Sequence, residues 1–213
     1  MKNKIPYGLH QLDDDDILAV VDILKSSHIT QGQTTDDFGQ ALADFAGAKY
    51  GLAVSNGTAA LHLSVAALGI GPGDEVITTP MTFCATANAV LYQGADVKFV
   101  DIDEKTLNID PDLIEEKLSK HTKAIIPVDF CGHPANLPKI KEIADKYNLK
   151  IIEDAAHSIG STYTHKGKKH YCGDGIHADF CTYSFHPVKH ITTGEGGAIL
   201  TNDEEQYHKL SLL

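Results

Sequence analysis

Short strand-like segments alternate with helical patterns along most of the chain, and this alternation constrains the fold more than any other feature. Seven segments are typical of strands: Tyr50–Val54, Glu75–Thr79, Asp96–Val100, Ala124–Val128, Lys150–Glu153, Phe180–Ser184 and Gly197–Thr201. Apolar residues at helical spacing separate the earlier ones, at Thr58–Leu68, Phe83–Gln93, Leu113–Leu118 and Leu137–Tyr147. The pattern predicts an α/β fold, a seven-stranded and mainly parallel sheet with helices on both faces. Ligands of such sheets gather at the carboxyl ends of the strands.

Helices are also expected at both ends of this region. An apolar stripe from Ile17 to Leu24 follows the acidic run Asp13–Asp16, which favours a helix start. Phe38 and Phe45 mark a second helix, and a last one begins near Asp203.

Composition and charge exclude several classes of function. The net charge of −11 argues against general nucleic-acid binding. No apolar run approaches the roughly 18 residues that span a membrane, so no membrane partner is expected. The first residues lack the apolar core of a signal peptide, which favours a cytoplasmic location. The four cysteines show no C-x-x-C spacing and the histidines no standard zinc spacing, so no metal is expected.

Lys189 lies in a polar loop that follows the Phe180–Ser184 segment and precedes Gly194, Gly196 and Gly197. Such glycines let the backbone pass close to a ligand. An aldehyde cofactor requires a lysine amine held on a rigid element. A lone loop lysine is more often a solvated charge, so the interpretation depends on the rest of the chain.

Four other features follow predicted strands. Ser55–Leu61 leads into a helix and offers free amides to a phosphate, although it is also typical of an ordinary helix cap. Asp154 ends a buried strand, where it either pairs with a pyridinium nitrogen or caps the next turn. Phe83 either stacks on a flat ring or belongs to the core. Ser184 offers a hydroxyl at the same edge. In this order, together with Lys189, these features predict a site for pyridoxal 5'-phosphate.

The chain resembles the DegT/DnrJ/EryC1/StrS family of sugar aminotransferases. The resemblance rests on Gly57–His62, Gly71–Val76, Glu153–Ser158 and the run Ser184–Gly197. It implies the large domain of a type I pyridoxal phosphate-dependent transferase. Within the family, the Lys189 run is most like members of the pseudaminic acid branch.

The resemblance also implies roles for individual residues. Lys189 would be the catalytic residue, bonding to the cofactor and moving the proton, and Asp154 would pair with the pyridine nitrogen. The remaining cofactor-binding positions would be Gly57, Thr58, Phe83, His157 and Ser184. The substrate-binding positions would be Tyr7, Ser27, His28, Ile29 and Thr30.

The implied reaction transfers an amino group from glutamate to C4 of a UDP-linked 4-keto-6-deoxy-N-acetylhexosamine, in a homodimer. Family members extend beyond the position of Leu213 into a small C-terminal domain. Residues 1–213 are therefore expected to form the N-terminal and large cofactor-binding domain alone. Two alternatives stay open: a catalytically incompetent remnant that binds cofactor or a partner, and another pyridoxal phosphate reaction on the same fold.

Overall fold

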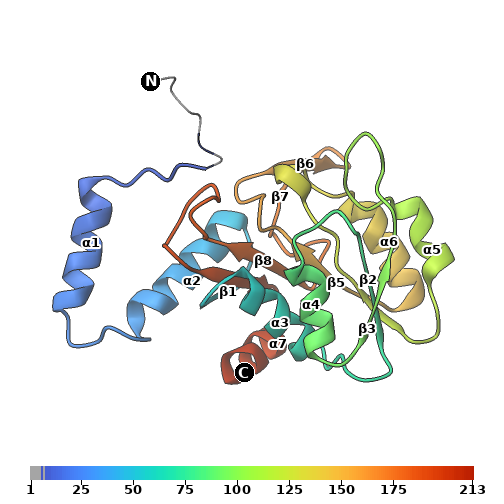
Figure 1. Cartoon of the computed structure of the whole chain (residues 1–213), viewed down its shortest axis with the longest axis horizontal. Helices are drawn as coiled ribbons and strands as arrows, with labels where there is room; N and C mark the ends of the chain where they lie inside the picture. The colour runs from blue at the N-terminus through green and yellow to red at the C-terminus, as the bar shows by residue number, and fades with distance from the viewer. Residues whose placement is uncertain (1–5, 7) are drawn as a thin grey trace.

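A computed structural model describes Pro6 and residues 8–213, and its central feature is a seven-stranded sheet (Figure 1). The strand order is β1-β9-β8-β5-β4-β2-β3. These strands are β1 (Tyr50–Val54), β2 (Glu75–Thr78), β3 (Asp96–Phe99), β4 (Thr122–Ile125), β5 (Lys150–Asp154), β8 (Phe180–Ser184) and β9 (Gly197–Thr201). Neighbours from β8 to β3 run parallel, whereas β9 is antiparallel to both β8 and β1. The predicted mainly parallel sheet is confirmed.

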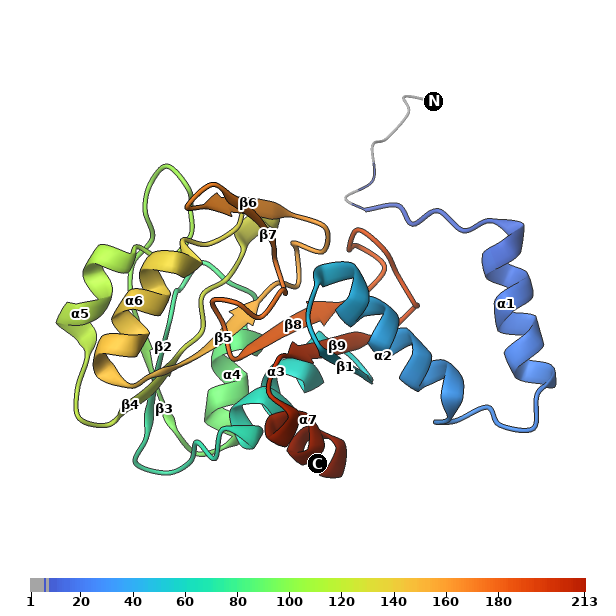
Figure 2. The ribbon, with the colours of Figure 1, turned by 180° about the vertical axis from the view of Figure 1, so that it is seen from behind.

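Helices cover both faces of the sheet, as Figures 1 and 2 show. The helices are α1 (Asp14–Lys25), α2 (Gln33–Ala46), α3 (Gly57–Ala67), α4 (Ala85–Tyr92), α5 (Ile114–Lys117), α6 (Leu137–Tyr147) and α7 (Glu204–Leu212), with short 3₁₀ turns at Pro111–Leu113 and Phe130–Gly132. Buried residues of α3, α4 and α7 form one apolar cluster with the sheet, and those of α5 and α6 form another. A third cluster joins α2 to β8 and β9.

Strand β5 lies in the middle of the sheet and contributes to both faces. Its side chains alternate between the faces, so Ile152 packs with α3 and α4 while Ile151 packs with α6. Both isoleucines are fully buried. This alternation decides on which side each carboxylate at the end of the strand lies.

The sequence did not predict a small hairpin, β6 (Thr162–His165) with β7 (Lys168–Tyr171). Its strands are mostly polar and therefore lack the apolar alternation that identified the others. The turn between them is Lys166-Gly167, with φ of 48° and 76°. Two successive positive φ values are typical of the tightest hairpin turns.

Helix α1 forms as predicted, but none of its residues is buried. The Asp13 and Asp16 side chains form a capping box at its start. Its apolar stripe is open to solvent, with Val20 61% and Leu24 66% exposed. Figures 1 and 2 both show α1 standing off from the sheet. In the described part of the chain, no helix is long and apolar enough to cross a membrane.

The contact between α2 and β1 depends on two glycines, which gives a first prediction. A Cβ atom at Gly39 would lie 2.4 Å from the backbone oxygen of Gly51. Gly39→Ala should therefore lower the free energy of unfolding by about 1–3 kcal/mol, the usual cost of overpacking. Urea unfolding followed by circular dichroism measures it. Thr35→Ala, at an exposed position of the same helix, is the control; equal stability of both variants would contradict the close contact.

Candidate functional site

The start of α3 lies directly against the end of β8. A Cβ atom at Gly57 would be 2.8 Å from Cβ and 3.2 Å from Oγ of Ser184. The Asn56 side chain caps the helix by accepting a hydrogen bond from the Ala59 amide at 2.8 Å. The first amides of a helix have no partners within it, so this end attracts an anion. The structure therefore brings Gly57 close to Ser184, with Thr58 next along the helix, and their binding of a phosphate stays a prediction.

Only glycine fits on the inner side of this cradle. A Cβ atom at Gly197, the first residue of β9, would lie 2.4 Å from the backbone carbon of Asn56. Gly197 also pairs with both Val54 and Ser184, so β1 and β8 end, and β9 begins, in one row across the sheet. The close approach of backbone to backbone explains the glycine at this position.

Asp154 ends β5 as a buried carboxyl group, 4% exposed. The Thr86 hydroxyl donates to its Oδ2 at 2.7 Å, and the Ala156 amide donates to its Oδ1 at 3.3 Å. Burial raises the pKa of Asp154, while the hydrogen bond from Thr86 acts in the opposite direction. Because the site is nearly dry, a cationic ring nitrogen facing Asp154 would be strongly favoured.

Thr86 is a candidate site residue that the sequence patterns did not indicate. Its hydroxyl also shares a 2.7 Å hydrogen bond with the hydroxyl of Thr82, which lies in the bend before α4. The acceptor of the Thr86 hydroxyl, Asp154, is 68 residues away in the sequence, so local patterns did not reveal this contact.

Lys189 is half-buried in the loop between β8 and β9. Burial lowers the pKa of its ammonium group, and the charge of Asp154 partly offsets this effect. Phe185 anchors the loop, since its carbonyl accepts hydrogen bonds from the Thr192 hydroxyl at 2.8 Å and the Thr193 amide at 3.1 Å. The arrangement gives a lysine with an increased neutral fraction, which is the form that attacks a carbonyl.

His157 and Phe83 lie on segments that follow β5 and β2. Burial lowers the pKa of the His157 imidazole, and the nearby charges of Lys189 and His190 lower it further. A neutral His157 thus lies on the Lys189 side of the edge. Phe83 precedes α4 and is 70% exposed. Its stacking on a cofactor ring stays a prediction.

The proposed substrate residues are not brought to this edge. Ser27, His28, Ile29 and Thr30 are exposed in the connection between α1 and α2. Figures 1 and 2 both show that connection apart from the loop after β8. Tyr7 lies outside the described residues. Its neighbour Gly8 is close to Val188, with a Cβ atom at Gly8 falling 3.1 Å from Val188 Cγ1.

Taken together, the edge holds an anion cradle, a buried carboxyl group and a half-buried lysine. These three groups suit a ligand with a phosphate, a basic ring nitrogen and an aldehyde, such as pyridoxal phosphate. The fit rests on the Gly57 cradle, which a Cβ atom would fill, and on the dry setting of Asp154.

Comparison with known proteins identifies one family. Residues 10–213 match the model of the DegT/DnrJ/EryC1/StrS aminotransferase family. The chain is 43% identical over 212 residues to the UDP-4-amino-4,6-dideoxy-N-acetyl-beta-L-altrosamine transaminase of Campylobacter jejuni, covering 98% of this chain and 54% of that protein. It is 42% identical over 211 residues to the GDP-perosamine synthase of Caulobacter vibrioides, covering 99% of this chain and 55% of that protein.

The fold is shared with solved structures. The crystal structure of NtdA from Bacillus subtilis with the bound cofactor PMP superimposes with a TM-score of 0.82 at 35% identity. This match covers 99% of our chain and 48% of NtdA. The chain spans about half the length of the curated relatives it matches.

The burial of Lys189 predicts an unusual reactivity with pH. Because its pKa is lowered, its amine should react with an acylating reagent at pH values where surface lysines are still protonated. Asp154→Asn removes the offsetting charge and should move the labelling curve to still lower pH. Peptide mass spectrometry over a pH series measures the rates, with exposed Lys120 as the internal control. Equal curves for both lysines would contradict the geometry.

Proposed function

The chain belongs to the DegT/DnrJ/EryC1/StrS aminotransferase family, and from this membership we propose that it is the large, cofactor-binding domain of a pyridoxal phosphate-dependent nucleotide-sugar aminotransferase. The observation that carries the proposal is the common position of the Gly57 cradle, Asp154 and Lys189 at one edge of the sheet. A fold alone supports many reactions, and these three groups are what select pyridoxal phosphate chemistry among them.

Each group has a defined task when the cofactor is present. The amides at the start of α3, with Thr58 and Ser184, would hold the phosphate. Asp154 would keep the ring nitrogen protonated, fixed by the hydrogen bond from Thr86. Lys189 would bond to the aldehyde in its resting state and afterwards move a proton at the substrate carbon. The cofactor supplies an electron sink for the carbanion.

His157 would help to orient the cofactor and would not supply a positive charge, because its lowered pKa favours a neutral imidazole beside Lys189. Burial serves the proton transfer as well. A lysine with a lowered pKa has a larger neutral fraction, and the neutral amine is the form that accepts a proton or attacks a carbonyl. The exposed Phe83 side chain would stack on the ring face.

For the substrates, we propose a UDP-linked 4-keto-6-deoxy-N-acetylhexosamine that is aminated at C4, with glutamate as the donor. The resemblance of the Lys189 run to the pseudaminic acid branch, and the similarity to the Campylobacter jejuni transaminase, support this choice. The similarity to the GDP-perosamine synthase is almost equal, so a GDP-linked sugar is the competing substrate.

A homodimer and a further C-terminal region complete this proposal. Ser27, His28, Ile29 and Thr30 are exposed and apart from Lys189 within one chain. A second subunit that brings these residues to the neighbouring site would give them their substrate-binding role.

The second candidate is a binding module without turnover. The observation that favours it is the uncovered apolar stripe of α1, where Ile17 is 52% and Leu24 is 66% exposed. Exposed apolar faces of this kind mark contacts with another protein surface. Such a module would bind the cofactor and leave catalysis to other parts of the assembly.

Absorbance spectroscopy tests the proposal in three steps. Adding pyridoxal phosphate to the protein should produce the band of a lysine-bonded cofactor, and Lys189→Ala should abolish it while Lys120→Ala keeps it. Glutamate should then convert the cofactor to its amino form, and the matching keto sugar should restore the band. Restoration by the GDP-linked sugar alone would replace the UDP assignment.

Two results contradict parts of the proposal. A cofactor band that persists in Lys189→Ala would remove the lysine from its role. A band that forms normally and ignores glutamate would favour the binding module.

A further inference from the structure

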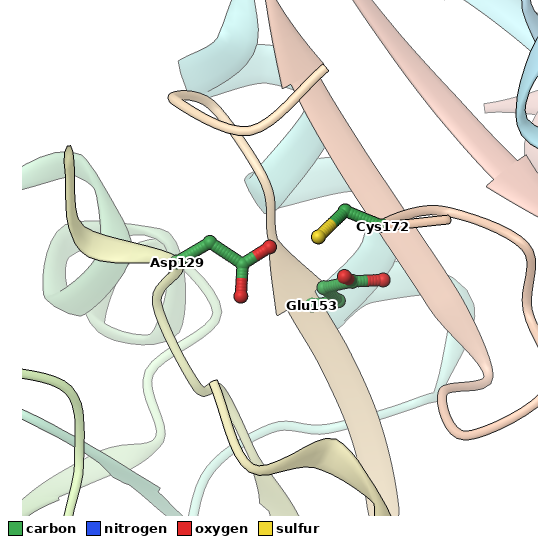
Figure 3. A group of neighbouring side chains, drawn as sticks. All are labelled: Asp129, Glu153 and Cys172. Atoms are coloured by element: carbon green, nitrogen blue, oxygen red, sulfur yellow. The ribbon is translucent and has the colours of Figure 1, made fainter. Parts of the chain in front are cut away.

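Two carboxyl groups and a thiol meet in the interior behind Asp154 (Figure 3). They belong to Asp129, Glu153 and Cys172, and their ligand-type atoms all lie within 4.8 Å of one another. None of the three side chains is more than 1% exposed. Two carboxylates this close cannot both keep their charge in a dry interior without a neutralising partner.

The hydrogen bonds around the two carboxyl groups indicate which of them accepts a hydrogen bond from the other. Asp129 Oδ1 accepts from the Ala135 amide at 2.8 Å, and Asp129 Oδ2 accepts from the Ser158 hydroxyl at 2.6 Å. Glu153 Oε2 accepts from the Gly173 amide at 3.0 Å, whereas Glu153 Oε1 is buried and has no partner. An unpaired buried oxygen is costly, unless it carries a proton and becomes a donor.

We propose that Glu153 carries a buried proton that it donates to Asp129, and that this pair fixes the end of β5 behind Asp154. The proton gives Glu153 Oε1 its missing partner and leaves one negative charge for the donors around Asp129. The pair then links the loop after β4, strand β5 and the loop after β7.

The pair is connected to the candidate site through the backbone. The Asp129 amide donates to the Asp154 carbonyl at 3.0 Å. Ser158, held by Asp129, ends the short turn that carries His157. Glu153 and Asp154 are consecutive, so the two side chains point to opposite faces of the sheet. Glu153 is therefore a positioning residue for Asp154 and His157, and this part rests on the function proposed above.

The other titratable groups facing Glu153 do not supply a counter-charge. Asp174, after β7, adds a further negative charge and is bonded to His170 at 2.7 Å. Burial raises the pKa of the Cys172 and Cys181 thiols and of the Tyr183 phenol, so these remain uncharged. In the described ranges, no salt bridge reaches either Asp129 or Glu153.

Burial and the neighbouring charge of Asp129 raise the pKa of Glu153 well above its usual range. The folded protein thus holds a proton that the unfolded chain releases near its ordinary pKa. Stability from this group is complete below the unfolded pKa and is lost as the pH rises through the folded pKa. The pair should break as the pH rises through the raised pKa of folded Glu153.

Infrared spectroscopy of the wild-type protein tests the proton directly. A carbonyl stretch of a protonated carboxyl group should be present near neutral pH and should disappear on raising the pH. Carboxyl ¹³C-labelling of glutamate should shift this band, whereas the same labelling of aspartate should not. A spectrum with no glutamate-dependent band would overturn the proposal, whatever the protein does with pyridoxal phosphate.

Two matched variants test the direction of the hydrogen bond. The amide of Glu153→Gln imitates the protonated side chain, so this variant should fold and keep the same urea midpoint over the pH range above the ordinary glutamate pKa in which the wild type declines. Asp129 accepts hydrogen bonds on both carboxylate oxygens, whereas the side-chain amide in Asp129→Asn has only one accepting oxygen. This variant should therefore be less stable than Glu153→Gln. The reverse order would place the proton on Asp129 and refute the assignment.

The positioning role has its own readout. The affinity of the wild type for pyridoxal phosphate, divided by the affinity of Glu153→Gln, should fall as the pH rises. A constant ratio would contradict the positioning role. Elemental analysis completes the test, because a stoichiometric metal ion that Glu153→Gln loses would show that a cation, and not a proton, joins the carboxyl groups.

Discussion

The parallel pairing of β5 with β8 is the constraint on which the rest of the site depends. It sets Asp154 opposite Thr182 in the middle of the sheet. Because side chains alternate along a strand, the register sends Asp154 to the α4 face and Glu153 to the other. A slip by one residue would exchange the two carboxyl groups. The buried residues Ile151 and Ile152, which pack in separate clusters, oppose such a slip.

The carboxyl groups of Asp154 and Glu153 have different surroundings on the two faces of the sheet. On one face, Asp154 accepts a hydrogen bond from Thr86 and is near the charge of Lys189. Its carboxyl group is therefore already oriented when a cationic ligand binds. On the other face, Glu153 is near the negative charges of Asp129 and Asp174 and otherwise near neutral groups, which favours a bound proton. The same dry interior thus supports a chemical role on one side and a structural role on the other.

Local patterns were sufficient to predict the sheet, and they drew attention to Asp154 and Lys189 because one ends and the other follows a strand with a clear apolar signal. The roles of these two residues stay predictions. The boundaries of β1, β8 and β9 were also predicted correctly. Thr86 and the Asp129–Glu153 pair were missed, since their contacts join segments far apart in the sequence. The β6–β7 hairpin was missed because its strands are polar.

The most direct test of the central claim is the ¹⁵N NMR signal of the cofactor ring nitrogen bound to the protein. If the register of β5 presents Asp154 to the ring, this nitrogen should stay protonated at pH values where the free cofactor has lost its proton. Asp154→Asn should abolish this protonation. A neutral ring nitrogen in the wild type, unchanged by the substitution, would contradict the account of the site.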